Sequence, residues 1–234
     1  MERGTIDMET MLQQAKAIED FIIALRHDLH QHPELGYQEF RTTERLEAEA
    51  QKLGLPYHRF DPTGLMIEIE GRPTGKRPRL RADMDALPIR EESDLEFKSC
   101  NGYGHMCGHD SHAAMLLGAA QILKDMEDSL KGSVKLVFQP GEETGAGARV
   151  LVENGLLENP KVDAAFGLHV QPATKTGEAG YSVGVNSSSL DTFILKIKGR
   201  GGHSSQPQLC VDPLMIMNQV YQAVNLLVTR EADP

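Results

Sequence analysis

The chain has 234 residues, 40% of them hydrophobic and 25% charged, an ordinary composition for a globular protein with room for one domain or one and a half. A formal net charge of -10 without a basic stripe argues against a nucleic-acid partner. Three cysteines are too few for a disulfide framework, and no signal-like or membrane-spanning stretch is found. We therefore expect a soluble cytoplasmic protein that does not engage membranes.

Apolar periodicity and turn residues give the expected elements in chain order. These are helix 6–29, helix 42–53, strand 65–70, strand 79–83, helix 113–123, strand 133–139, a buried strand within 163–170, strand 192–198 and helix 212–227. Pro33 should end the first helix at or before His32, and Gly54 should cap the second. The histidines near residue 30 fit a helix terminus at least as well as a metal site.

The stretch from His105 to His112 carries three imidazoles, a thiol and a carboxylate within eight residues. Thiolate and neutral imidazole are preferred ligands of zinc and similar ions, so the cluster as a whole predicts a metal site. We expect its donors in the loop that enters the following helix. The alternative is that His105 and His112 are surface residues and Cys107 is a small buried hydrophobe.

Further polar residues follow the predicted strands. Asp83 and Asp85 end one strand, and ligands commonly bind at the carboxyl edge of an α/β sheet. Glu142 and Glu143 follow the next strand, and their side chains should diverge, so that one binds metal while the other faces the substrate as a base. His169 ends the third strand, which favours a ligand over a structural histidine.

The chain resembles the amidohydrolase branch of the aminoacylase and carboxypeptidase metallopeptidase family, which includes hippurate hydrolase, N-acyl-L-amino acid amidohydrolase and the indole-acetyl-amino-acid hydrolases. The matching stretches lie in family order and span nearly the whole chain. They are 29–36 (LHQHPELG), 80–88 (LRADMDALP), 105–110 (HMCGHD), 139–143 (QPGEE), 167–169 (GLH), 201–203 (GGH) and 211–213 (VDP).

The resemblance implies a fold and a set of roles. The fold is α/β: a three-layer αβα, zinc-peptidase-like catalytic domain with a mixed sheet over residues 1–188, then the start of an α+β lid or dimerisation domain over 189–234. The implied metal ligands are Cys107, His109, Glu143 and His169. Glu142 matches the general base and Asp85 an acid that orients a ligand or the base. His203 matches a substrate-binding histidine that reaches the neighbouring subunit's site, whereas the role of Asp83 stays open.

The implied reaction is hydrolysis of the amide bond of an N-acyl or N-aroyl amino acid, such as hippurate, to a carboxylate and a free amino acid. The implied cofactors are two divalent metal ions, zinc or manganese, with cobalt or nickel as alternatives. The implied partners are a small-molecule N-acyl amino acid and, for a full-length parent, a second copy in a homodimer. A dipeptidase or carboxypeptidase with the same site is an alternative, as is an inactive metal-binding remnant.

The sequence departs from the family pattern at its end. The family's catalytic domain is completed by a segment after the lid that supplies a last histidine ligand, whereas no histidine follows His203 here. We therefore expect a chain truncated at its C-terminus, either a fragment of a longer enzyme or a shortened product. Part of the apolar lid helix would then stay unpacked.

Overall fold

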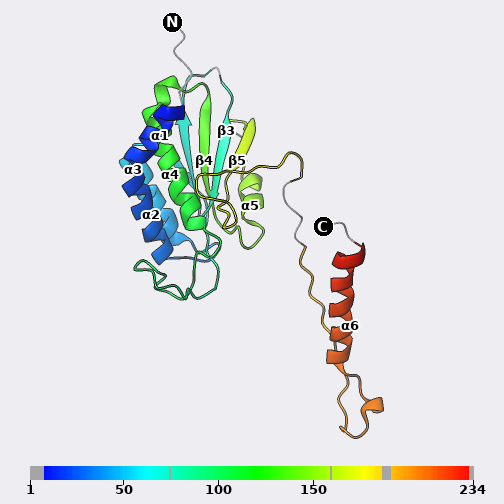
Figure 1. Cartoon of the computed structure of the whole chain (residues 1–234). Helices are drawn as coiled ribbons and strands as arrows, with labels where there is room; N and C mark the ends of the chain where they lie inside the picture. Colours follow the sequence, from blue (N-terminus) through cyan, green and yellow to red (C-terminus); the bar gives the residue numbers. More distant parts are fainter. Residues whose placement is uncertain (1–7, 74, 159, 186–190, 232–234) are drawn as a thin grey trace. The chain divides into compact units, whose positions relative to one another are not determined.

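The computed structural model describes residues 8–73, 75–158, 160–185 and 191–231 (Figure 1). Its contacts divide the chain into two units, Met1–Gly180 and Tyr181–Pro234. The domain boundary that we predict, between residues 188 and 189, falls outside the described residues and stays a prediction.

The first unit is built on a mixed sheet with helices packed against it. The strands are β1 (Tyr57–Arg59), β2 (Leu65–Glu70), β3 (Pro78–Asp83), β4 (Ser133–Gln139) and β5 (Ala164–Gly167). The helices are α1 (Met8–Ala17), α2 (Glu19–Gln31), α3 (Phe40–Lys52), α4 (His109–Asp125) and α5 (Gly147–Glu153), with a 3-10 turn at Glu127–Ser129. The predicted α/β fold is thus confirmed.

The sheet has the order β1-β2-β4-β3-β5. Strands β1, β2 and β4 pair antiparallel, whereas β3 pairs parallel with both β4 and β5. The chain runs from β3 through α4 to β4 on one side, then through α5 to β5 on the other side of β3. The strand order therefore reverses around β3, and β3, β4 and β5 all end at the same edge of the sheet.

The core lies in two layers, one on each face of the sheet. On one face, Leu136 and Phe138 of β4 pack with Leu117 of α4 and with residues of α2 and α3. On the other face, Val137 of β4 packs with Leu151 of α5. Consecutive residues of a strand point to opposite faces, so β4, which is buried along its whole length, needs apolar cover on both sides. Figure 1 shows α1–α4 on one side of the sheet and α5 on the other.

The single helix predicted for 6–29 is instead two helices. Ile18 lies between α1 and α2 at φ -110° and ψ 12°, outside helical geometry. Ile18 and Ile22 both lie close to Gly118 of α4, whose missing side chain leaves room for them. The prediction for the next helix holds, since Gly54 follows α3 at φ +64° and donates its N–H to the Gln51 carbonyl. Residues 1–7 lie outside the described part of the chain.

The prediction of a buried strand before His169 is half right. Strand β5 forms, but all of its residues are exposed, and 63% of the surface of Phe166 is accessible to solvent. The strand lies at the edge of the sheet and pairs with β3 alone among the described strands. No element among the described residues buries the apolar side chains of β5.

The second unit contains helix α6 (Pro213–Leu226), a 3-10 turn at Pro207–Leu209 and a π-helical turn at Leu227–Glu231. The predicted helix is confirmed, and the Asp212 side chain caps it by accepting the Leu214 N–H at 2.9 Å. The predicted strand 192–198 is wrong: a strand needs a paired neighbour, and the only bridge among the described residues of this unit joins Arg200 to Val211. None of the described helices is long and apolar enough to cross a membrane.

Candidate metal centre

The polar side chains singled out in the sequence gather at the edge where the three parallel strands end. Asp85 follows β3, Glu142 and Glu143 follow β4, and His169 follows β5. Cys107 and His109 stand at the start of α4, between β3 and β4. These loops meet where the strand order reverses, which is where open α/β sheets bind their ligands.

His109 is the first residue of α4 and is completely buried. Its Nδ1 donates to the backbone carbonyl of Asp85 at 2.9 Å, which leaves the Nε2 lone pair free. That Nε2 atom is buried and has no hydrogen-bond partner among the described residues. A buried nitrogen with a fixed, unused lone pair is what a metal ligand requires.

Glycine is required at the residue before His109. Gly108 has φ +91°, and a Cβ atom there would lie 2.4 Å from Cγ2 of Val170. The left-handed backbone and the close approach of Val170 both exclude a larger residue. This glycine therefore lets the loop after β5 come down onto the start of α4.

Cys107 and His169 meet across that approach. The Cys107 Sγ lies 3.2 Å from the His169 Nε2, and with His109 they form a group of donor atoms that all lie within 4.8 Å of one another. Burial, reinforced by the carboxylates of Glu143 and Glu142, raises the pKa of the Cys107 thiol to about 11. A cation among these groups would reverse that effect and favour the thiolate.

Contrary to our prediction, the side chains of Glu142 and Glu143 do not diverge. Glu142 Oε2 and Glu143 Oε1 each lie 3.9 Å from the His109 Nε2, and the three side chains form a second group of donors. Residues 142–145 form a turn, so the alternation of side chains along a strand does not apply to them. Burial and the neighbouring Glu142 carboxylate raise the pKa of Glu143, although His109 opposes the shift.

Asp85 supports both groups from behind. Its Oδ2 accepts the Glu143 N–H at 2.9 Å, and its Oδ1 lies 3.3 Å from the His109 Nδ1. The side chain is buried and faces the back of His109 rather than its free nitrogen. Burial lowers the pKa of His109, but the carboxylates of Asp85, Asp83 and Glu142 outweigh this and raise it.

The loop after β4 is held by residues that the sequence did not single out. The buried Glu39 accepts the Gly141 N–H at 2.8 Å and the Thr63 hydroxyl at 2.6 Å. A Cβ atom on Gly36 would lie 2.9 Å from Thr144 Cγ2, so the segment before α3 packs directly on this loop. Nothing in the sequence marks Glu39 as more than a surface acid near a helix start, whereas Gly36 lies in a stretch that carries the family resemblance.

His105 and His112 are buried, so the surface alternative is wrong for both. His112 Nδ1 lies 2.5 Å from Asp83 Oδ1, and Arg81 donates to Asp83 Oδ2 at 2.7 Å. Burial lowers the pKa of His105 to about 4, and neither of its ring nitrogens has a partner among the described residues.

His203 lies in the second unit, where it is exposed and contacts Ser205 through its Nδ1. The structure brings together Cys107, His109, Glu142, Glu143 and His169, with Asp85 behind them. His203 belongs to the other unit, and its role stays a prediction.

The donors present fit a divalent metal ion. His109 belongs to both groups of donor atoms, and its free Nε2 faces the two glutamate carboxylates of the second group. One thiol, imidazole nitrogens and carboxylate oxygens are the donor types that first-row ions bind in proteins.

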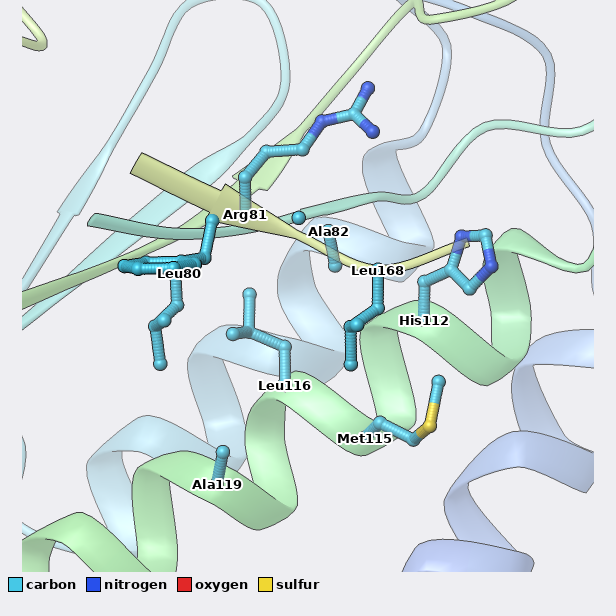
Figure 2. Close-up of a pocket in the computed structure, with 10 residues that line it drawn as sticks. Leu80, Arg81, Ala82, His112, Met115, Leu116, Ala119 and Leu168 are labelled. Carbon is cyan, nitrogen blue, oxygen red and sulfur yellow. The ribbon is translucent and has the colours of Figure 1, made fainter. Parts of the chain in front are cut away.

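A cavity of about 340 Å³ lies beside this centre, between α4 and the strands β3 and β5 (Figure 2). Leu80, Leu116 and Phe166 are among its lining residues, and His112 also borders it. Figure 2 shows Leu116, Met115 and His112 along α4 and Leu168 in the segment beyond β5. The apolar lining fits an apolar group rather than the charged part of a ligand.

The chain is similar to several known proteins. The chain is 44% identical over 218 residues to IAA-amino acid hydrolase ILR1-like 5 of Arabidopsis thaliana, covering 92% of this chain and 49% of the relative. It is 39% identical over 232 residues to thermostable carboxypeptidase 2 of Saccharolobus solfataricus, covering 97% of this chain and 58% of the relative. The crystal structure of a Bacillus subtilis protein, described as a dinuclear metal binding peptidase, has a TM-score of 0.64 at 42% identity and covers 68% of this chain and 45% of that chain.

The chain thus spans about half the length of the curated relatives that it matches. Residues 79–232 match the family described as Peptidase family M20/M25/M40, and this stretch contains all the donor side chains at the carboxyl edge of the sheet. The chain therefore belongs to peptidase family M20/M25/M40.

Proposed function

We propose that the chain is the metal-binding part of an amidohydrolase that releases an amino acid from an N-acyl or N-aroyl conjugate of the hippurate type. The observation that carries the proposal is the gathering of thiol, imidazole and carboxylate donors around His109, whose Nε2 has no hydrogen-bond partner among the described residues. The similarity to an amino acid conjugate hydrolase supports the same reaction class.

In this proposal Cys107, His109, Glu143 and His169 hold two divalent ions. Zinc suits the thiol and imidazoles best, manganese is the second choice, and cobalt or nickel would also be accepted. The similarity to a dinuclear metal binding peptidase supports the number. Bound there, the ions would lower the pKa of a coordinated water and polarise the amide carbonyl.

Glu142 is the general base and acid of the proposed reaction. Its side chain is 39% exposed while its carboxylate lies beside His109, so it borders both the donors and the solvent. It would take a proton from the attacking water and return it to the leaving nitrogen. Asp85 is a positioning residue, since it fixes His109 from behind and accepts the Glu143 N–H.

The remaining assignments rest on the family resemblance and on the composition. His203 would bind the substrate in the neighbouring subunit of a full-length homodimer. A reducing, cytoplasmic setting fits the three free cysteines, since Cys107 must stay unoxidised to bind metal.

Two alternatives use the same centre. A carboxypeptidase would cut a peptide bond, and the similarity to thermostable carboxypeptidase 2 supports this alternative function. An inactive remnant would bind metal without turnover. The amidohydrolase, the carboxypeptidase and the inactive remnant would differ in substrate and in the need for Glu142, but they would use the same metal ligands.

The test compares Glu142→Gln with wild type for metal content and for hydrolysis of hippurate, an N-acetyl amino acid and an N-blocked dipeptide. Glu153→Gln is the matched control, because Glu153 is an exposed residue of α5 paired with Arg149. We expect Glu142→Gln to keep its metal and to lose activity by about 10²–10⁴-fold, while the control is unchanged. Full activity in Glu142→Gln contradicts its role, dipeptide cleavage alone favours the carboxypeptidase, and metal without turnover in wild type favours the remnant.

A further inference from the structure

His112 makes two hydrogen bonds that link three parts of the first unit. Its Nδ1 lies 2.5 Å from Asp83 Oδ1 at the end of β3, and its Nε2 lies 2.9 Å from the backbone N of Val170 beyond β5. A backbone N–H can only donate, so the His112 Nε2 accepts. The proton of the neutral ring therefore sits on Nδ1, where it is donated to Asp83.

Both ring nitrogens of His112 are thus occupied. Asp83, His112 and His109 form the third group of donor atoms, and the other Asp83 oxygen accepts from Arg81 at 2.7 Å. Because the lone pair of His112 is already used and each Asp83 oxygen already accepts a hydrogen bond, this group has fewer free donor positions for an ion than the other two groups. Its geometry suits a support better.

The supported segment carries His169. The His169 Nδ1 donates to the Val170 carbonyl at 2.7 Å, which leaves its Nε2 lone pair facing the Cys107 Sγ at 3.2 Å. The Val170 side chain lies over Gly108, directly before His109. The position of the Val170 peptide therefore sets where His169 stands relative to Cys107.

This segment has little other anchorage among the described residues. Strand β5 is exposed and pairs only with β3, and Leu168 keeps most of its surface in contact with solvent. Burial therefore cannot fix this segment, whereas the hydrogen bond that the Val170 N–H donates to the buried His112 can.

We propose that His112 is a positioning residue: with Asp83 it forms a bridge from β3 to the Val170 N–H that holds His169 against Cys107 in the binding geometry. The proposal rests on the proposed metal centre, and it gives the open residue Asp83 a role as support rather than ligand. Residues that orient ligands from behind typically change metal affinity about 10–100-fold when replaced.

Two near-isosteric substitutions separate the two bonds. In His112→Gln, the side-chain oxygen stands near the position of Nε2 and can still accept the Val170 N–H. In His112→Asn, the amide nitrogen stands near the position of Nδ1 and can still donate to Asp83, but it does not reach Val170. His58→Gln on β1 is the control, since His58 is an exposed histidine in the same unit.

The first readout is hydrogen exchange at the Val170 amide in the metal-free 234-residue chain, with circular dichroism to verify folding. The bridge predicts slow exchange in wild type, His58→Gln and His112→Gln, and fast exchange in His112→Asn. Equal exchange in His112→Asn and wild type would overturn the bridge, whether or not the chain binds metal.

The second readout is a Co²⁺ titration followed through the absorption of the cobalt–thiolate bond. We expect the Kd for Co²⁺ to rise about 10–100-fold in His112→Asn and less than about threefold in His112→Gln. Equal losses in both variants would mean that His112 is a ligand and overturn its role as support. If wild type binds no Co²⁺, the metal centre itself fails, and the exchange at Val170 alone decides the bridge.

Discussion

Helices α4 and α6 are both rich in apolar residues, but their side chains end in different surroundings. In α4 the apolar residues pack under the sheet, and Leu117 is completely buried. In α6 no residue is buried, and Leu214 keeps 75% of its surface exposed. Apolar periodicity thus predicts that a helix forms, whereas burial depends on a partner surface that the pattern does not contain.

The same contrast separates the two units. The metal donors lie in the first unit, where α4 is fixed between the sheet and α2 and its first residue is a candidate ligand. The described residues of the second unit include none that is buried. A centre that needs ligands fixed to within a fraction of an ångström can be built only on the first kind of scaffold.

The largest effect should come from the core beneath the centre. We expect Leu117→Ala to lower the free energy of unfolding by about 2–5 kcal/mol, because it leaves a cavity between α4 and the sheet. Leu214→Ala in α6 should change it by less than about 0.5 kcal/mol, since that side chain is already exposed. Urea unfolding measures both. A comparable loss from Leu214→Ala would show that α6 has a partner surface in solution.

A smaller effect should depend on pH. Burial raises the pKa of Asp83, but the hydrogen bond with His112 and the nearby His109 and Arg81 outweigh it and lower the pKa from 3.8 to about 2. A carboxylate with a lowered pKa stabilises the fold above its unfolded pKa, and this stability is lost as the pH falls toward the folded value.

We therefore expect wild type to lose on the order of 2 kcal/mol through Asp83 between about pH 5 and pH 2. Asp83→Asn should lack this component, so the difference in stability between the two proteins should shrink on acidification. Urea unfolding of the metal-free proteins across this range checks it. A difference that stays constant with pH would show that the charge of Asp83 does not contribute.

The smallest effect should come from the cap of α6. Asp212→Ala removes the acceptor for the Leu214 N–H and should destabilise the helix by about 1 kcal/mol, whereas Asp212→Asn should cost little. Amide exchange in the first turn of α6 reports the change, and the core of the first unit should be unaffected. Equal exchange in both variants would mean that the cap contributes nothing.

Much of the fold followed from the sequence because local patterns decide it. Strands β2 and β4 have the bounds that alternation and apolar content predict. The helix predicted at 113–123 starts four residues earlier, at His109, so His109 and His112 lie in the helix and not in the loop before it, where we predicted the donors. The metal cluster was visible because its donor types are concentrated within a few residues. Both signals are local, and sequence carries local signals well.

The rest depends on contacts between distant residues. Glu39 accepts a hydrogen bond from Gly141 in the loop after β4, and His112 joins β3 to Val170. The spacing of residues along the chain does not predict either contact. The exposure of β5 and the missing strand at 192–198 have one cause, because a strand is defined by its neighbours. The two glutamates face the same way because a turn, not a strand, holds them.

The most direct test of the metal centre is the stoichiometry of zinc bound by the 234-residue chain, compared between wild type and His109→Gln. Because both groups of donor atoms that we assign to the ions include His109, we expect two equivalents in wild type and a clear loss in the variant. A wild-type chain that binds no zinc, or a variant that binds as much as wild type, would contradict it.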